Sequence, residues 1–370
     1  MRVLVTSAGT GGHINPAIAI ANKIKNENKD CEILFIGRKE GMEHDLITKA
    51  GYDIKGISTG KLLRKLTLKN VKEMINAYKG ISDSKKILKQ FNPDICIGTG
   101  GYICMPVMLA ARSLKIPYVL HESNSYPGLS TKLLAKKASK VLCGFEKTIE
   151  NLGNNKNYIY TGTPSTINYY EYNKLDKNEC RNRLNIDLNK KVILVTFGSQ
   201  GAKYLNYKIM DMILQFKNEN ILYVLITGAN NYDEVLEYLN SKNKEYLKYI
   251  KLEKYVYNMQ ELYKASDMCI TRAGALTITE LVITKKPALL IPLPYATENH
   301  QYHNALVIEE AECGKIIEEK NFSNDEINKY IIDITQNDSK LIAMENNYNK
   351  ILKLDVIDVI YNEIKEVIKK

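Results

Sequence analysis

Short runs of β-branched and other apolar residues alternate with helical patterns along this chain of 370 residues. The alternation predicts βαβ units and a parallel sheet, because parallel strands must be joined by a crossover, usually a helix. A polar stretch rich in Asn, Tyr and Lys follows residues 161–164 and runs to residue 191, after which the alternation restarts. We therefore expect an α/β protein of two doubly wound, Rossmann-like domains facing an interdomain cleft. The predicted strands are residues 3–7, 33–37, 95–99, 118–122 and 141–145 in the first domain, and 192–197, 222–227, 268–271 and 288–291 in the second.

The predicted domain borders follow from this restart. Residues 1–163 form the N-terminal domain and residues 164–340 the C-terminal domain. Residues 341–370 have helical spacing of apolar residues and are expected to form a C-terminal helix that packs back across the domains. In folds of this kind a ligand binds at the carboxyl ends of the strands.

Several classes of protein are disfavoured by composition. Met1 leads straight into a strand-like run without the basic and apolar regions of a signal peptide, so export is not expected. No window approaches the roughly 18 consecutive apolar residues of a membrane span, so any membrane contact should be peripheral. The seven cysteines occur singly, which indicates reduced core residues and no disulfide or metal site.

The formal net charge of +10 is unevenly distributed. Residues 61–90 contain nine Lys or Arg against two acidic residues, and Lys61, Arg64, Lys65, Lys69 and Lys72 accompany apolar side chains. That combination suits an anionic lipid surface. A nucleic-acid partner is not expected, because the aromatic residues that stack on bases are missing. A solvated helix face with ordinary internal packing is the alternative.

The first glycine-rich loop directly follows the first predicted strand and reads SAGTGGHINP over residues 7–16. Glycines there let backbone N–H groups approach a ligand and present a helix N-terminus to it, with Pro16 suited to the first helical turn. Near the positive end of a helix dipole an imidazole is disfavoured as the cation, so His13 would stay neutral and able to take a proton. A tight turn without a ligand, or a satisfied core histidine, is the alternative.

Two more segments follow predicted strands of the first domain. Residues 98–102 read GTGGY and residues 121–124 read HESN. Since the carboxyl ends of parallel strands meet at one edge of a sheet, these loops should border the same crevice as the first. Four consecutive polar groups at a strand end indicate a site, although capping of the following turn would also explain them.

The most specific motif of the second domain is TRAGALTITE, residues 271–280, where a strand leads into a helix. The free N–H groups of such a helix suit a pyrophosphate, and Glu280, roughly two turns on, could accept two ribose hydroxyls. Surface solvation is the alternative for Glu280. Residues 197–202, FGSQGA, place Ser199 among glycines that admit an oxygen, and residues 298–304, ENHQYHN, offer amides suited to sugar hydroxyls.

In this order the motifs resemble the MurG family, the UDP-GlcNAc:undecaprenyl-pyrophosphoryl-muramyl-pentapeptide GlcNAc transferases of glycosyltransferase family 28, and the resemblance runs from Met1 to about Lys320. It implies the GT-B fold and an inverting transfer of GlcNAc from UDP-GlcNAc to the C4 hydroxyl of lipid-linked muramyl-pentapeptide (lipid I), giving lipid II for peptidoglycan and cell-wall synthesis. It also implies no cofactor, no metal, an acceptor-side N-terminal domain, a UDP-GlcNAc-binding C-terminal domain, and a peripheral position on the cytoplasmic side of the cell membrane.

The resemblance implies a role for each matching residue. His13 would be the catalytic base and Glu122 a second acidic candidate. The sugar and acceptor side would be lined by Thr10, Gly11, Gly12 and Asn124. The nucleotide sugar would be held by Ser199, Gln200, Val256 (through its backbone beside the uracil), Arg272, Ala273, Gly274, Ala275, Leu276, Thr277, Glu280, Gln301 and Asn304.

The chain departs from the family pattern in three places. Residues 162–166 read GTPST where the family has Gly-Asn-Pro-Val-Arg, so the family arginine is absent at Thr166. The first loop begins Ser7-Ala8 in place of two glycines, and a Gln-Gln pair is His300-Gln301 here.

Two other enzyme classes compete with this interpretation. A nicotinamide dehydrogenase requires G-x-G-x-x-G and an acidic residue that ends the second strand, but here that strand ends in Gly37-Arg38. Another UDP-sugar enzyme of the same architecture, such as a UDP-GlcNAc 2-epimerase or a diacylglycerol glycosyltransferase, remains open because one fold supports many functions.

Overall fold

The computed structural model describes residues 1–7, 9, 11–38, 41–58, 68–198, 201–242, 244–256 and 258–369, with the side chains at 42, 68–75 and 77 excepted. The chain divides into two compact units, Met1–Ser165 with Lys353–Lys370, and Thr166–Leu352. The division between the units thus follows residue 165, where the sequence suggested residue 163. The segment expected as one C-terminal helix is divided between the units.

The first unit is built on a seven-stranded parallel sheet with the order β3-β2-β1-β4-β5-β6-β7. Its central strands are buried on both faces, which is why they read as unbroken apolar runs in the sequence. The strands are β1 (Arg2–Thr6), β2 (Glu32–Arg38), β3 (Asp53–Ile57), β4 (Ile95–Gly98), β5 (Tyr118–Glu122), β6 (Lys140–Cys143) and β7 (Tyr158–Tyr160).

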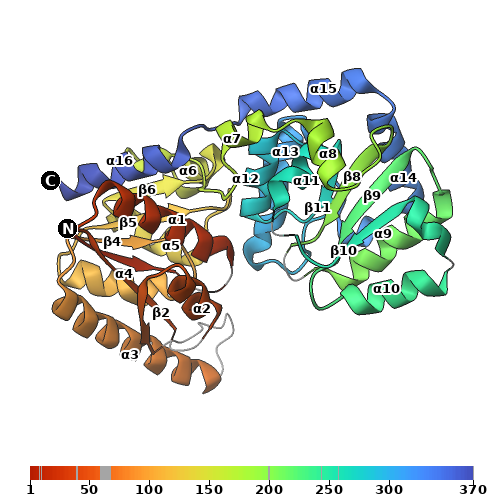
Figure 1. Cartoon of the computed structure of the whole chain (residues 1–370). Coiled ribbons are helices and arrows are strands. Elements are labelled where there is room, and N and C mark those ends of the chain that lie inside the picture. The colour runs from red at the N-terminus through yellow and green to blue at the C-terminus, as the bar shows by residue number, and fades with distance from the viewer. Residues whose placement is uncertain are drawn as a thin grey trace. The chain divides into compact units, whose positions relative to one another are not determined.

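Helices cover both faces of this sheet (Figure 1). Side chains of β1 alternate between the two cores: Leu4 packs in the core that contains α4, and Val3 and Val5 pack in the core that contains α1 and α16. The helices of this unit are α1 (Gly11–Glu27), α2 (Met42–Lys49), α3 (Leu68–Phe91), α4 (Cys104–Ser113), α5 (Leu129–Leu134), the 3₁₀ turn η1 (Ala135–Lys137), α6 (Glu146–Leu152) and α16 (Val356–Ile368).

The final helix α16 returns to the first unit and packs against α1 and β6 (Figure 1). Its apolar face buries Ile360 and Ile364, and Lys140 of β6 pairs with two of its carboxylates. A Cβ atom at Gly162 would lie 2.8 Å from Val356, so a glycine lets the returning chain pass close to the end of β7.

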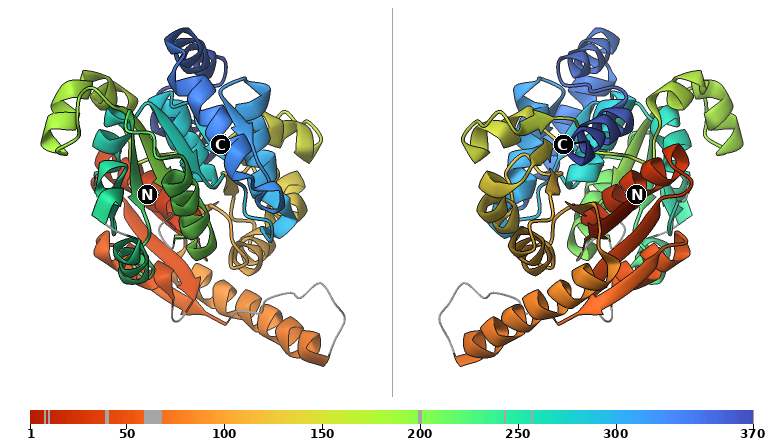
Figure 2. Two further views of the ribbon diagram at one scale, coloured as in Figure 1. Left: turned by 90° about the vertical axis from the view of Figure 1, so that its right-hand side faces the viewer. Right: turned by 90° about the vertical axis from the view of Figure 1, so that its left-hand side faces the viewer.

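The second unit repeats this plan with a six-stranded parallel sheet of order β10-β9-β8-β11-β12-β13. Helices again lie on both faces (Figures 1 and 2). The strands are β8 (Lys191–Thr196), β9 (Ile221–Ile226), β10 (Ile250–Glu253), β11 (Met268–Thr271), β12 (Ala288–Leu290) and β13 (Gly314–Ile316). The helices are α7 (Tyr169–Lys174), α8 (Lys177–Arg183), α9 (Lys203–Phe216), α10 (Tyr232–Ser241), η2 (Lys244–Lys248), α11 (Met259–Ala265), α12 (Ala275–Thr284), η3 (Thr297–Asn299), α13 (His300–Glu310), η4 (Glu319–Asn321), α14 (Asn324–Thr335), α15 (Asp338–Asn347) and η5 (Tyr348–Lys350).

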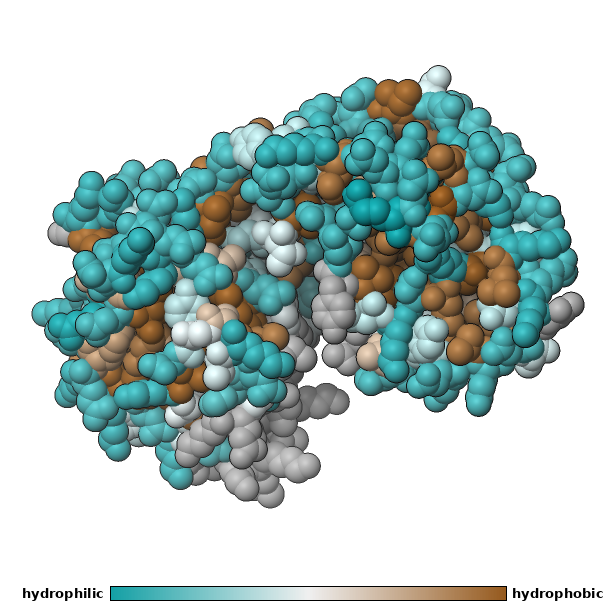
Figure 3. Space-filling view, viewed as in Figure 1, coloured by the Kyte–Doolittle hydropathy of each residue, from teal (hydrophilic) through white to brown (hydrophobic). Residues whose placement is uncertain are grey.

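In both sheets the strand order starts in the middle, runs to one edge and then to the other, which is the doubly wound order. The two Rossmann-like α/β units predicted from the sequence are therefore confirmed. All seven cysteines are free and buried, as expected of core residues. Within the described part of the chain, no helix is long and apolar enough to cross a membrane. Hydrophilic residues cover most of the face seen in Figure 3.

Candidate active site

The order of the first sheet reverses between β1 and β4, and the loops after these strands meet there. The helices that follow lie on opposite faces, because α1 belongs to one core and α4 to the other. Three of the predicted site residues, Gly11, Gly12 and His13, form the first turn of α1. The helix thus begins at Gly11, so Pro16 lies inside it and not in its first turn. Because proline has no N–H, the carbonyl of Gly12 lacks its usual helical donor.

His13 is tied to the loop after β4 by two reciprocal hydrogen bonds. Its Nδ1 lies 3.0 Å from the carbonyl oxygen of Thr99, and the Thr99 hydroxyl donates to the carbonyl of His13 at 2.8 Å. A carbonyl oxygen can only accept, so Nδ1 carries the proton and the lone pair of the neutral ring lies on Nε2. The backbone of a neighbouring strand loop therefore sets both the ring orientation and the tautomer.

Gly100 gives this ring its space. A Cβ atom at Gly100 would lie 2.6 Å from Nδ1 of His13, and the residue has φ +107°, a conformation that L side chains rarely adopt. The GTGGY motif thus contacts the histidine of the first motif directly: Gly100 leaves space for the ring, and the Thr99 carbonyl accepts its Nδ1–H.

The carboxylate of Glu122, at the end of β5, bonds to its own loop. Its Oε1 accepts from the backbone N–H and the side-chain amide of Asn124, both at 3.1 Å. Its Oε2 accepts from the backbone N–H of Gly128 at 3.1 Å and from the hydroxyl of Thr131 at 2.6 Å. With four donors on two oxygens and 3% of the residue exposed, Glu122 holds the loop that carries Asn124 and the start of α5.

The sequence assigned no role to His121, which is buried at the same strand end. Its Nε2 lies 3.1 Å from the carbonyl oxygen of Gly162, so this nitrogen carries the proton. Burial lowers the pKa of His121, which keeps the ring neutral. The pair joins the ends of β5 and β7. Its place in the HESN motif at a strand end is the sequence signal that could have indicated this role.

In the second unit the strand order reverses between β8 and β11, and α12 starts there. Its N-cap is Gly274, which has no side chain, so no side-chain cap bonds to the first N–H groups of the helix. Leu276 and Thr277 are partly exposed in this first turn, whereas Ala275 is buried. A helix that starts after a glycine, with no side chain bonded to its first N–H groups, has the geometry of an anion site.

Two side chains of α13 form hydrogen bonds with the backbone of Ala273. Oε1 of Gln301 accepts from the N–H of Ala273 at 3.3 Å and from the N–H of Leu293 at 2.9 Å. The amide of Asn304, fully buried, donates to the carbonyl of Ala273 at 3.2 Å. These two predicted donor-site residues therefore fix the turn that leads into α12.

Arg272 points into the unit. Its Nη1 donates to the carbonyls of Ile291 and Pro292, both at 3.0 Å, and its Nη2 pairs with Glu319 at 2.6 Å. These contacts tie the end of β11 to the end of β12 and to η4. The structure thus brings Arg272 to the site as a support of its backbone.

Glu280, in the second half of α12, accepts a hydrogen bond from the hydroxyl of Tyr263 at 3.0 Å. Burial raises the pKa of Glu280 to about 7, and the Tyr263 bond opposes that rise. A carboxylate with a raised pKa and no cationic partner among the described residues is typical of a functional position. Its bond to the buried Tyr263 does not fit the alternative of a fully solvated side chain.

Four predicted residues remain. Thr10, Ser199 and Gln200 lie outside the described residues. Val256 lies half-buried in the loop that follows β10.

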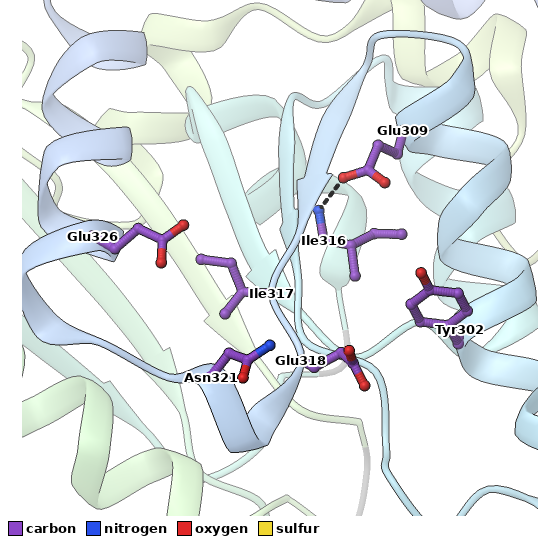
Figure 4. A pocket seen from close by; sticks show the side chains of 7 residues that line it. All are labelled: Tyr302, Glu309, Ile316, Ile317, Glu318, Asn321 and Glu326. Atoms are coloured by element: carbon purple, nitrogen blue, oxygen red, sulfur yellow. Dashed lines mark hydrogen bonds between the residues drawn. The ribbon is translucent and has the colours of Figure 1, made fainter.

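A small pocket of about 200 Å³ in the second unit uses none of the predicted residues (Figure 4). Each of its three carboxylates already has a partner: Glu309 accepts from the N–H of Ile316, Glu318 pairs with Lys320, and Glu326 pairs with Lys315. Three carboxylates in the lining would repel the phosphates of a nucleotide, so the pocket is not a second candidate for that ligand. Its lining residues are Tyr302, Glu309, Ile316, Ile317, Glu318, Asn321 and Glu326.

Comparison with known proteins gives a consistent result across the whole chain. The glycosyltransferase family 28 N-terminal domain matches residues 3–143, and the family 28 C-terminal domain matches residues 192–359. A UDP-N-acetylglucosamine–N-acetylmuramyl-(pentapeptide) pyrophosphoryl-undecaprenol N-acetylglucosamine transferase of Thermoanaerobacter sp. is 37% identical over 99% of this chain and all of its own length. The protein of the same name from Clostridioides difficile is 38% identical over 99% of this chain and 89% of its own.

Solved structures extend the likeness to the fold. The crystal structure of Acinetobacter baumannii MurG matches with a TM-score of 0.80 at 24% identity, over 99% of both chains. A UDP-GlcNAc 2-epimerase from Neisseria meningitidis matches with a TM-score of 0.66 at 16% identity, over 99% of this chain and all of its own. The expected GT-B fold class is thereby confirmed.

Proposed function

The chain belongs to glycosyltransferase family 28, and on that premise we propose that it transfers GlcNAc from UDP-GlcNAc to the C4 hydroxyl of the muramyl residue in undecaprenyl-pyrophosphoryl-muramyl-pentapeptide. The observation that carries the proposal is the full-length likeness to transferases of that name. In this reaction the bond from the acceptor oxygen to C1 of GlcNAc forms as the bond from C1 to the pyrophosphate oxygen breaks. UDP leaves with the electron pair, and C1 is inverted.

His13 is the proposed general base. The Thr99 carbonyl fixes the proton on Nδ1, which leaves the lone pair on Nε2 to take the proton of the attacking hydroxyl. The start of α1 disfavours a cationic ring before the reaction, which keeps the base available. Glu122, the second acidic candidate, is proposed to act by holding Asn124 and α5 in place for the acceptor.

The start of α12 is proposed to bind the pyrophosphate of the donor. Its uncapped N–H groups meet negative charge that grows as UDP leaves, so they stabilise the transition state more than the ground state. Gln301, Asn304 and Arg272 support this turn from behind. Glu280 is proposed to accept hydrogen bonds from the ribose hydroxyls.

The acceptor carries a lipid, so we propose that the protein works as a peripheral protein on the cytoplasmic side of the cell membrane. The basic stretch at residues 61, 64, 65, 69 and 72 falls where backbone or side chains are not described. Among the described residues, α5 and the turn η1 support the proposal, because Leu129 and Leu133 are 54% and 61% exposed and the exposed Lys136 and Lys137 follow in η1. Apolar side chains flanked by cations suit a layer of anionic lipid headgroups. Glu122 anchors the same helix to the proposed acceptor loop.

The test is an assay with UDP-GlcNAc and a water-soluble lipid I analogue. We expect UDP release that requires both substrates, with a disaccharide product in the β configuration. A 2-epimerase would instead convert UDP-GlcNAc without an acceptor, and consumption of the donor in that control would overturn the proposal.

A further inference from the structure

We infer that Tyr263 is a positioning residue, which holds the carboxylate of Glu280 in the orientation that accepts the ribose hydroxyls of the nucleotide. The inference rests on the proposed function and adds to it a residue for which neither the motifs nor the comparisons give a role. Tyr263 itself does not touch the nucleotide in this scheme; it acts through Glu280.

The geometry of the pair supports this role. The phenolic hydroxyl of Tyr263 donates to Oε2 of Glu280 at 3.0 Å. Within the described part of the chain, the Glu280 side chain makes this one hydrogen bond, so Oε1 can accept from a ligand. A carboxylate held through one oxygen loses less rotational freedom when a ligand binds the other.

Tyr263 is itself immobile. It lies on α11, is 1% exposed and ranks among the largest fully buried side chains of the protein. Its helix packs against α12, which carries Glu280. A ring packed this tightly keeps its hydroxyl in one place, which a tyrosine at the surface would not do.

The hydrogen bond also bears on the charge of Glu280. Burial raises the pKa of Glu280 to about 7, and the donated bond opposes this by stabilising the ionised form. Among the described residues, Cys269 of β11 and Tyr348 of η5 act electrostatically on Tyr263, and Lys286 acts on Cys269. Burial raises the pKa of Cys269 to about 12 and that of Tyr348 well above its usual range. Burial lowers the pKa of Lys286, whose side-chain nitrogen donates to the carbonyl of Ser266. Glu280 is the carboxylate of this set, and its pKa of about 7 places its own titration near neutral pH.

The experiment measures binding of UDP-GlcNAc by calorimetry from about pH 6 to about pH 8.5, a range in which its pyrophosphate neither gains nor loses a proton. For the unchanged protein we expect affinity to rise with a midpoint near pH 7. Tyr263→Phe should move that midpoint up by about one unit, so that the ionised fraction at pH 7 falls from about one half to about one tenth and binding weakens about fivefold. Tyr263→3-fluorotyrosine keeps the ring and makes the hydroxyl a stronger donor, so the midpoint should move down.

Tyr246→Phe is the matched control. Tyr246 is also buried in the second unit, and its hydroxyl donates to the side chain of Asn240 at 3.1 Å. Its loss should leave the midpoint in place. In a Glu280→Gln background, Tyr263→Phe should change affinity by less than about 1.5-fold, because the two residues act as one unit.

The outcomes distinguish a failure of the proposed function from a failure of the role of Tyr263. If the unchanged protein does not bind UDP-GlcNAc at all, the proposed function fails. If it binds but Tyr263→Phe and Tyr263→3-fluorotyrosine leave the midpoint unmoved, or if Tyr263→Phe weakens binding equally at every pH, Tyr263 is a packing residue only and this inference is overturned.

Discussion

Gly100 lies against the imidazole of His13 so closely that a Cβ atom would come within 2.6 Å of Nδ1. The contact joins the first turn of α1 to the loop after β4, more than 80 residues away in sequence, and it determines where the proposed base can sit. Gly100→Ala should therefore displace the ring and lower kcat about 10-fold or more, since small misplacements of a catalytic group are costly. UDP-GlcNAc affinity should be nearly unchanged.

The control for Gly100→Ala is Gly51→Ala. Gly51 has φ +85°, a similar left-handed conformation in the same unit, but nothing lies within 4 Å of the position of its Cβ. Gly51→Ala therefore introduces similar backbone strain, but its Cβ atom meets no neighbouring group. If both variants lose kcat equally, strain and not the position of His13 is responsible.

His13→Ala should lower kcat by about 10²–10⁴-fold, because a general base contributes mainly in the transition state. Binding of UDP, measured by calorimetry, should stay within about twofold, since His13 and the nucleotide motifs belong to different units. An equal loss in both measurements would mean that His13 contributes to the fold or to donor binding.

Glu280→Gln should weaken UDP-GlcNAc binding at pH 8 by about 10-fold or more, because hydrogen bonds to a charged acceptor are worth about 1.5–3 kcal/mol. The same change should stabilise the nucleotide-free protein. The folded-state pKa of about 7 lies above the usual 4.5. Between these pH values the folded protein holds a proton that the unfolded chain releases, so stability falls as pH rises through this window. The gain of Glu280→Gln should reach up to about 3 kcal/mol at pH 8 and vanish near pH 4 in urea unfolding.

Arg272→Ala should act on stability. It leaves two carbonyls and the Glu319 carboxylate without their buried donor, so the free energy of unfolding should fall by about 2–4 kcal/mol. Urea unfolding at pH 7 gives this value. Arg183→Ala is the control, because its pair with Glu261 is partly exposed and should contribute less than about 1 kcal/mol. A fully stable Arg272→Ala variant that no longer binds UDP would show direct contact with the donor instead.

Leu129→Ser with Leu133→Ser should reduce sedimentation with vesicles that contain anionic lipid, with little effect on turnover of a water-soluble acceptor. Leu247→Ser is the matched control, since Leu247 is 62% exposed in the other unit. Replacing Lys61, Arg64, Lys65 and Lys69 with Ser should weaken binding further, more strongly at low salt. Unchanged vesicle binding in all of these variants would place the membrane contact elsewhere.

The sequence revealed the central strands of both sheets and left out all four edge strands. The strands without a prediction are β3, β7, β10 and β13, which end the two sheets. A strand in the middle of a parallel sheet is buried on both faces and reads as an apolar run, whereas β3 has alternating exposure and β13 is only partly buried. An edge strand carries a weaker pattern, so its position depends on the neighbour with which it pairs.

Motif order and apolar patterning thus determined the two α/β units, the family and which loops are candidates for the site. They could not determine what each polar side chain touches. Glu122 lies in the HESN motif, but its carboxylate bonds to its own loop. Arg272 lies in the motif proposed for the nucleotide, but its guanidinium bonds to carbonyls at the end of a strand. The tautomer of His13 depends on a carbonyl 86 residues away, and the pKa of Glu280 on burial and on Tyr263. Local sequence sets backbone preference and burial, but hydrogen-bond partners and ionisation depend on groups that only the packed tertiary structure brings within 3 Å.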